Sequence, residues 1–247
     1  MLDEKKISWG QELPGTDSKI SLRSRVGWSE LTPVVVSVVM ITYNHESFIS
    51  QAIESVLDQI TDFRVELIIG EDASMDSTRS VCEGYAARYP SIVRLLQSQK
   101  NIGMHGNLAR TYSAAIGDYV ALLEGDDYWI CSSKISRQLA AMRSRASASL
   151  CGHRVVQTDL QGKVSGLIPA LGSEIPSTSD EFIERGCDMH TSSLFFVNYP
   201  NLFSMTSLQD ERNYCLDYTL KLLLADRGEI VFFPEVMSVY RNHLGGI

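Results

Sequence analysis

The sequence predicts an α/β protein with an open, mostly parallel, twisted sheet flanked by helices. Two observations carry this prediction. The run from Val34 to Ile41 is almost continuously apolar and β-branched, as in strands that are buried on both faces of a parallel sheet. Such runs then alternate with amphipathic helical segments at short spacing, which is the pattern of βαβ units. Right-handed crossovers place helices of this kind on the two faces of the sheet.

The first half of the chain alternates strands and helices in a regular order. Apolar residues from Phe48 to Leu57 recur with helical spacing. Asp76 stands where an N-cap would begin the second helix, and Gly117 stands where the third helix would end. The expected elements are a strand at 34–41, a helix at 48–57, a strand at 65–69, a helix through 81–89, a strand at 92–96, a loop at 101–107, a helix through 108–116 and a strand at 119–123.

The second half of the chain follows a looser pattern. Residues 149–176 mix Gly, Ser and Pro with apolar residues, so no regular element is assigned there. Residues 1–32 are polar and aperiodic, and we expect them to form an N-terminal extension to one domain at 33–247. The expected elements are a helix at 135–142, a strand at 193–197, a helix at 215–224 and short strands at 230–233 and 236–240.

Composition and charge exclude several classes of protein. The chain has 247 residues, of which 44% are hydrophobic and 21% charged, as in ordinary globular domains. A net charge of −8 argues against a non-specific nucleic-acid binder, which needs a basic surface. The five cysteines are scattered without a CxxC pair, so we expect reduced packing residues. No secretory signal and no run of 18 apolar residues is present. We therefore expect a cytoplasmic protein, and peripheral association with the inner face of the membrane stays open.

Acidic side chains follow three of the expected strands. Asp72 ends the second strand, Asp126 and Asp127 end the fourth, and Glu46 lies just beyond the first. Ligands of open parallel sheets bind beyond the carboxyl ends of the strands, where these acids would gather. Asp72 could accept a hydrogen bond from a nucleoside base or simply form an Asx turn, and the spacing favours neither.

The pair Asp126–Asp127 predicts a metal–diphosphate site. Two adjacent carboxylates repel each other, and the repulsion grows near a core of low dielectric constant. A divalent cation removes this penalty, and Mg²⁺ or Mn²⁺ typically binds one or two carboxylates together with substrate phosphates. The alternative is a capped turn, in which Asp is common.

Five motifs together resemble glycosyltransferase family 2, whose members have the A-type nucleotide-sugar fold. The motifs are VSVVMITYNHESFISQAIESVLDQ, ELIIGEDASMDST, NIGMHGN, AAIGDYVALLEGDDYW and FFPEVMSVYRNHLGG, and the resemblance covers residues 34–247. It implies transfer of a sugar from a nucleoside diphosphate donor (a UDP-, GDP- or dTDP-sugar), with Mn²⁺ or Mg²⁺ and usually with inversion. The acceptor would be a glycan, a lipid-linked molecule or a protein, in polysaccharide or glycoconjugate biosynthesis.

The resemblance also implies roles for single residues. By position, the nucleotide-sugar site would comprise Thr42, Tyr43, Glu46, Asp72, Asn107 and Asp126. Asn107 stands where many family members have an arginine that touches the base. Asp127 would ligate the metal, and His243 is a weaker candidate for the same role, with a solvent-exposed histidine as the alternative. Arg241 is a second candidate for contact with the diphosphate.

The acceptor side and the catalytic base fall in the second half of the chain. Asp217 matches the carboxylate that serves as general base, although without the resemblance it would be expected to be a solvated residue at a helix start. His190 and Thr191 would line the acceptor side, and Trp129 would either stack on a sugar or seal the sheet edge. The nucleotide-binding half would then be about 33–130 and the acceptor-side half about 131–247.

Two alternative functions stay open at this point. A nucleotidyltransferase would normally carry a basic, Gly-rich loop after its first strand, and TYNHES is neither basic nor Gly-rich. A non-catalytic module that binds nucleotide sugars would not need the carboxylates Asp126, Asp127 and Asp217 to be intact.

Overall fold

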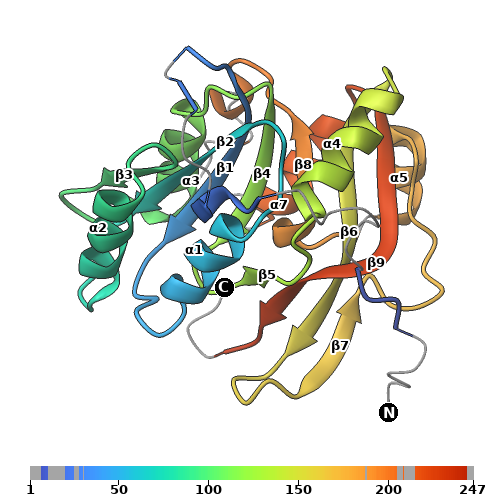
Figure 1. Ribbon diagram of the computed structural model, residues 1–247. Coiled ribbons are helices and arrows are strands. Elements are labelled where there is room, and N and C mark those ends of the chain that lie inside the picture. Colours follow the sequence, from blue (N-terminus) through green and yellow to red (C-terminus); the bar gives the residue numbers. More distant parts are fainter. Residues whose placement is uncertain are drawn as a thin grey trace.

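The first half of the protein forms the four-stranded parallel part of the sheet. The computed structural model describes residues 7–10, 20–24, 28–29, 31–186, 188–204, 208 and 215–243. The strands in this half lie side by side in the order β3-β2-β1-β4, and all three pairings are parallel (Figure 1). The elements are β1 (Val34–Thr42), α1 (Ile49–Leu57), β2 (Arg64–Glu71), α2 (Thr78–Arg88), β3 (Val93–Gln97), α3 (Gly103–Ser113) and β4 (Tyr119–Glu124).

The second half extends the same sheet with mixed pairing. The full order is β3-β2-β1-β4-β8-β6-β9-β5, with β7 paired to β6, which makes nine strands within the described residues. The β6–β9 pair is parallel, whereas β8 is antiparallel to both β4 and β6. The elements are β5 (Tyr128–Trp129), α4 (Lys134–Ser144), β6 (Ala148–Thr158), β7 (Val164–Ile168), α5 (Ser179–Arg185), β8 (Phe195–Val197), α7 (Leu216–Ala225), β9 (Glu229–Arg241) and the short 3-10 helices η3 (Leu22–Ser24), η4 (Thr191–Ser193) and η5 (Leu202–Ser204).

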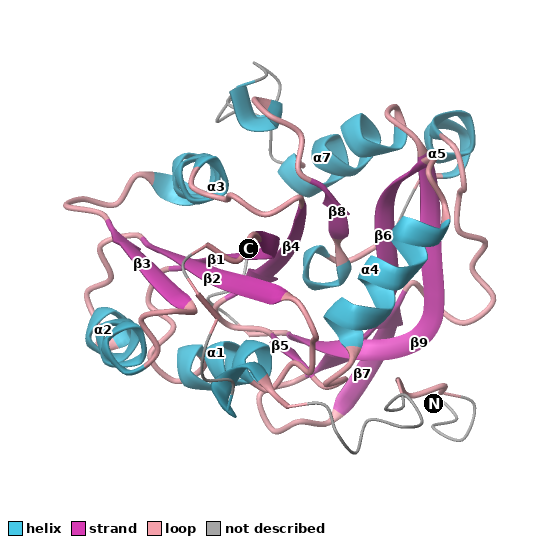
Figure 2. Cartoon of the chain, turned by 45° about the horizontal axis from the view of Figure 1, so that its top comes forward, coloured by secondary structure: helices cyan, strands magenta, loops and turns pink. Residues whose placement is uncertain are grey.

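The predicted α/β class is confirmed, and β1 shows why. Its alternate residues enter two different cores, because successive side chains of a strand point to opposite faces. Val38 belongs to the cluster that includes Ile53 of α1, whereas Val39 belongs to the cluster that includes Leu108 of α3 and Leu220 of α7. Figure 2 shows α1 and α2 on one side of the sheet and α3 and α7 on the other.

Several local expectations differ from the structure, among them the N-cap of α2, which is Ser77 and not Asp76, and the end of α3, which is Ser113 and not Gly117. Residues 149–176 contain the buried strand β6 and its partner β7, and Gly152 within β6 is needed because a side chain there would collide with the sulfur of Met189. The two short strands expected near the end are one strand, β9, whose register against β6 shifts near Pro234. The helix expected from residue 108 begins at Gly103, so Asn107 lies in α3 and not in a loop.

The described parts of residues 1–32 pack against the domain. Leu22 is buried in the core beside α1, and its backbone N–H donates to the carbonyl of Gln59. Trp9 forms a bridge with Val236 of β9. Within the described residues, no helix combines the length and apolar character needed to cross a membrane.

Candidate active site

A cavity of about 520 Å³ lies at the carboxyl ends of β1, β2 and β4. Side chains from α3, from the start of α7 and from the segment before η4 complete its walls. Nine of the residues expected from the sequence to form the site line this one cavity. They are Thr42, Tyr43, Asp72, Asn107, Asp126, Asp127, His190, Thr191 and Asp217.

The turn after β4 carries the acidic residues into the cavity. Gly125 lies against β1, and its N–H donates to the carbonyl of Ile41 at 2.9 Å. A β-carbon at Gly125 would lie 2.5 Å from the hydroxyl oxygen of Thr42, so the close approach needs glycine. Asp127 is only 1% exposed, and its Oδ1 accepts the backbone N–H of Arg241 at 3.0 Å. The end of β9 therefore fixes the orientation of the Asp127 carboxylate.

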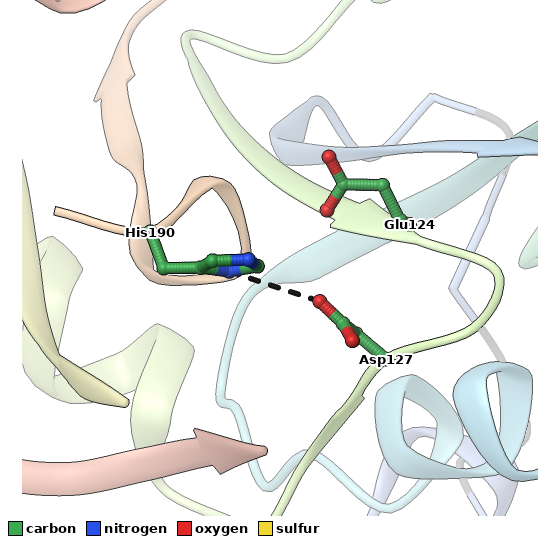
Figure 3. Close-up of side chains that lie close together, drawn as sticks. All are labelled: Glu124, Asp127 and His190. Carbon is green, nitrogen blue, oxygen red and sulfur yellow. Dashed lines mark ion pairs between the residues drawn. The ribbon is translucent and has the colours of Figure 1, made fainter. Parts of the chain in front are cut away.

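Glu124, Asp127 and His190 converge on one point, as Figure 3 shows. One ligand atom from each of the three residues lies within 4.8 Å of the others. His190 Nδ1 is 3.7 Å from Asp127 Oδ2, the contact drawn as a dashed line. Glu124 Oε2 is buried and has no hydrogen-bond partner among the described residues. Such an orphaned buried oxygen is costly unless a ligand satisfies it.

The electrostatics of this cluster favour a bound cation. Burial and the nearby charge of Asp126 raise the pKa of Glu124 to about 8. Burial and the charge of Glu124 raise the pKa of Asp127 well above its ordinary value. Burial and the positive charge of Lys221 lower the pKa of His190 to about 4, which leaves the imidazole neutral and able to donate a lone pair. Two carboxylates and a neutral imidazole fit a divalent cation of the Mn²⁺ type.

Asp126 takes a different set of partners from those of Asp127. Its Oδ2 lies 3.0 Å from His243 Nε2 and 3.5 Å from His45 Nε2. His243, a weaker candidate for a metal ligand in the sequence, therefore contacts Asp126 and is not part of the Glu124–Asp127–His190 cluster. The guanidinium of Arg241 is held by the carbonyl of Asp126, by Gln51 and by the rings of Phe48 and Tyr128. It supports the turn instead of reaching into the cavity.

Asp217 reaches the cavity from the first turn of α7. Half of its side chain is exposed. Its Oδ2 is 2.9 Å from Nζ of Lys221, one turn further along the helix.

The wall at β2 and α3 carries the residues expected to hold a nucleoside. Asp72 is buried, and its Oδ1 accepts the N–H of Ile102 at 2.9 Å. Both polar atoms of the Asn107 amide are engaged, because Nδ2 donates to the carbonyl of Gly70 and Oδ1 accepts from Arg110. Asp72 thus keeps one carboxylate oxygen for a ligand, whereas Asn107 is tied to the sheet.

Besides His243, two residues expected at the site do not line the cavity. Glu46 accepts the N–H of Ser77 and so supports the start of α2. Trp129 is 4% exposed, donates from Nε1 to the carbonyl of Ser192 and packs against the ammonium of Lys134.

Three residues of the site were not assigned from the sequence. Glu124, His45 and Lys221 all lie at or beside the cavity. Glu124 could have been found as the last residue of a strand that ends in an acidic turn. Lys221 carries only the signal of an i, i+4 pair with Asp217, which is common on exposed helices.

The fold and the acidic cavity define an A-type glycosyltransferase domain, and the solved structures with the same fold agree. The S. aureus TarS 1–349 structure in complex with UDP has a TM-score of 0.63 at 16% identity, over 85% of this chain and 61% of that one. The mannosyltransferase PcManGT from Pyrobaculum calidifontis, in complex with GDP-Man and Mn²⁺, has a TM-score of 0.61 at 14% identity, over 91% of this chain and 63% of that one.

The family model described as Glycosyl transferase family 2 matches residues 37–198. The chain therefore belongs to glycosyltransferase family 2. Among its relatives is the uncharacterized protein Rv1520 of Mycobacterium tuberculosis, 36% identical over 86% of this chain. The chain spans 60% of the length of that relative. The putative teichuronic acid biosynthesis glycosyltransferase TuaG of Bacillus subtilis is 32% identical over 51% of this chain and 49% of its own length.

Proposed function

We propose that the protein transfers a sugar from a nucleoside diphosphate donor to an acceptor hydroxyl, with a divalent metal ion and with inversion at the anomeric carbon. The observation that carries this proposal is the orphaned Oε2 of Glu124 within the Glu124–Asp127–His190 cluster, in the same cavity as Asp217. A buried acidic cluster of this kind is stable with a cation, and a carboxylate across the cavity from it can serve as a base.

The metal would be held by Glu124, Asp127 and His190. Bound there, Mn²⁺ or Mg²⁺ would neutralise the charge that develops on the departing diphosphate. The Mn²⁺ in the PcManGT complex supports this assignment for the fold, and the donor set of the cluster supports it for this chain. The hydrogen bond from the backbone N–H of Arg241 to Asp127 Oδ1 supports this role, because it fixes the orientation of the carboxylate.

Asp217 would take the proton from the acceptor hydroxyl as that oxygen attacks the anomeric carbon. Its exposed position at the cavity and its place in the first turn of α7 support this role. A single displacement with one base and no protein nucleophile inverts the anomeric configuration.

The donor nucleoside would bind along β1 and β2. Asp72 Oδ2, which takes no part in the bond to Ile102, would accept from a base N–H, and Thr42 and Tyr43 line the same cavity at the end of β1. UDP and UDP-GlcNAc in the TarS complexes and GDP-Man in the PcManGT complex support a nucleotide-sugar donor. The first half of the domain, about 33–130, would therefore bind the donor, and the second half, about 131–247, would bind the acceptor.

The acceptor would be a glycan, a lipid-linked molecule or a protein in polysaccharide or glycoconjugate biosynthesis. The name of the relative TuaG supports a role in building a cell-surface polymer. The exposed side of Asp217 marks where the acceptor would enter.

The test is release of nucleoside diphosphate from a panel of UDP-, GDP- and dTDP-sugars, with Mn²⁺ and with a chelator. We expect one donor to be consumed only when the metal is present. An Asp217→Asn variant should keep donor and metal binding and lose transfer, whereas Asp180→Asn, in the first turn of α5, should leave transfer unchanged. Full turnover by Asp217→Asn would exclude Asp217 as the base. Release of pyrophosphate from a nucleoside triphosphate would instead favour a nucleotidyltransferase.

A further inference from the structure

Lys221 is a buried lysine that joins two parts of the cavity. It is 4% exposed, although lysine is rarely buried unless it is paired. Its ammonium donates to Asp217 Oδ2 at 2.9 Å and to the backbone carbonyl of Met189 at 2.8 Å. One buried charge thus contacts the proposed base on one side and the chain next to His190 on the other.

The contact to Met189 bears directly on the metal cluster. Met189 is buried and immediately precedes His190, whose imidazole is one of the three clustered ligand groups. The thioether of Met189 packs against Gly152 of β6. The carbonyl that Lys221 holds is part of the peptide unit that leads into His190. Loss of the hydrogen bond from Lys221 to this carbonyl would therefore shift the backbone of His190, and with it the position of the imidazole.

The segment after His190 is fixed from the opposite side. Trp129 Nε1 donates to the carbonyl of Ser192 at 3.0 Å, and Gln138 Nε2 donates to the carbonyl of Ser193 at 2.9 Å. Residues 189–193 are therefore held by α7 at one end and by β5 and α4 at the other. Among these contacts, the one from Lys221 is shared with Asp217 and so links the segment to the base.

We propose that Lys221 is a positioning residue that holds the general base Asp217 and the metal-binding segment at His190 in one fixed arrangement. This rests on the function proposed above. The base lies on α7 and the imidazole lies on an irregular segment, so no shared secondary structure sets the geometry between them. Lys221 supplies that link through a single ammonium group.

The experiment compares Lys221→Met, Lys221→Arg and the exposed control Lys163→Met. Methionine has a similar length and suits a buried site, so the fold is expected to survive. Three quantities are measured: hydrogen exchange of the peptide covering 188–193 in the free protein, Mn²⁺ affinity by calorimetry, and kcat and KM with the donor found above. The double variant Lys221→Met/Asp217→Asn completes a mutant cycle.

We expect Lys221→Met to speed exchange in 188–193, to weaken Mn²⁺ binding about 10- to 100-fold and to lower kcat by a similar factor, as is typical when the support of a metal ligand is lost. Lys221→Arg should recover most of the Mn²⁺ affinity and most of kcat. Lys163→Met should change neither the Mn²⁺ affinity nor kcat. Asp217→Asn should lower kcat with Mn²⁺ affinity intact, and at saturating Mn²⁺ adding Lys221→Met to it should lower kcat by a smaller factor than Lys221→Met lowers it in the wild type.

Unchanged exchange in 188–193 together with unchanged Mn²⁺ affinity in Lys221→Met would overturn the proposal. Additive losses of kcat in the mutant cycle at saturating Mn²⁺ would show that Lys221 does not act through Asp217, which also overturns the proposal. If the wild-type protein transfers no sugar, the proposed function fails, and hydrogen exchange alone still decides whether Lys221 fixes the segment.

Discussion

The ammonium of Lys134 is a fully buried charge-bearing group, and replacing it tests the electrostatic reasoning directly. Lys134 begins α4 with no exposed surface. Its Nζ donates to Gln138 Oε1 at 2.8 Å and lies 4.0 Å from the centroid of the Trp129 ring. Burial lowers the pKa of Lys134 from 10.5 to about 7.

This shift destabilises the folded protein at low pH. Below about pH 7 both states hold the proton, and a difference of 3.5 pKa units corresponds to a penalty of roughly 5 kcal/mol on the folded state. Between the two pKa values the unfolded state binds more protons, so the penalty shrinks as the pH rises. It falls by roughly 2.5 kcal/mol between about pH 6 and about pH 9.

The variant Lys134→Met removes the titrating group at similar volume. Loss of the hydrogen bond to Gln138 costs about 1 kcal/mol, which offsets a small part of the stability gained by removing the buried charge. We expect the variant to be more stable than the wild type at about pH 6, and the gap to narrow steadily toward about pH 9. The measurement is the free energy of unfolding in urea at several pH values.

Lys163→Met is the matched control, because Lys163 is exposed. The free energy of unfolding of Lys163→Met should equal that of the wild type at every pH. The titration of all other groups then cancels when Lys134→Met is compared with the wild type. A gap between Lys134→Met and the wild type that does not change with pH would refute the reasoning. So would a variant that is less stable than the wild type at low pH.

Three further predictions concern the cavity. Gly125→Ala should abolish Mn²⁺ binding in calorimetry with the circular dichroism spectrum retained, because the new β-carbon would lie 2.5 Å from the hydroxyl oxygen of Thr42 and displace the acidic turn. Arg241→Lys should lower kcat about 10- to 100-fold, since a lysine cannot reproduce the forked contacts that support the turn; unchanged kcat would contradict this. Asp72→Asn should raise the Kd of the nucleoside diphosphate about tenfold without changing Mn²⁺ affinity, since asparagine can still accept from Ile102.

The parallel half of the fold was predictable because its strands are continuous apolar runs. Val34 to Thr42 is buried on both faces as expected, and Asp72 and Asp127 meet at one cavity because parallel strands end on the same edge. The strand β6 was not predictable from periodicity. Some of its buried polar residues are satisfied by tertiary contacts, as when Ser149 donates to the carbonyl of Leu224.

The sequence predicted which acidic residues gather at the site, but not which side chains each of them contacts. Two short strands were expected near the end of the chain, but β9 runs on through Pro234 as one strand and ends beside the acidic turn. His243, which follows β9, therefore faces Asp126. Asn107 lies in a helix because Gly103 adopts φ of 78° and lets α3 begin five residues early. Such outcomes depend on packing that a single sequence does not display.

The hydrogen bond from the Arg241 backbone to Asp127 joins residues 114 positions apart in the chain. Contacts of such long sequence separation form late, because the entropy of closing a long loop opposes them. On the ribosome, the acidic turn therefore cannot take its final shape until residue 241 has been synthesised and has emerged. The parallel strands are synthesised long before then, so the residues of that part of the sheet leave the ribosome before the acidic turn can be completed.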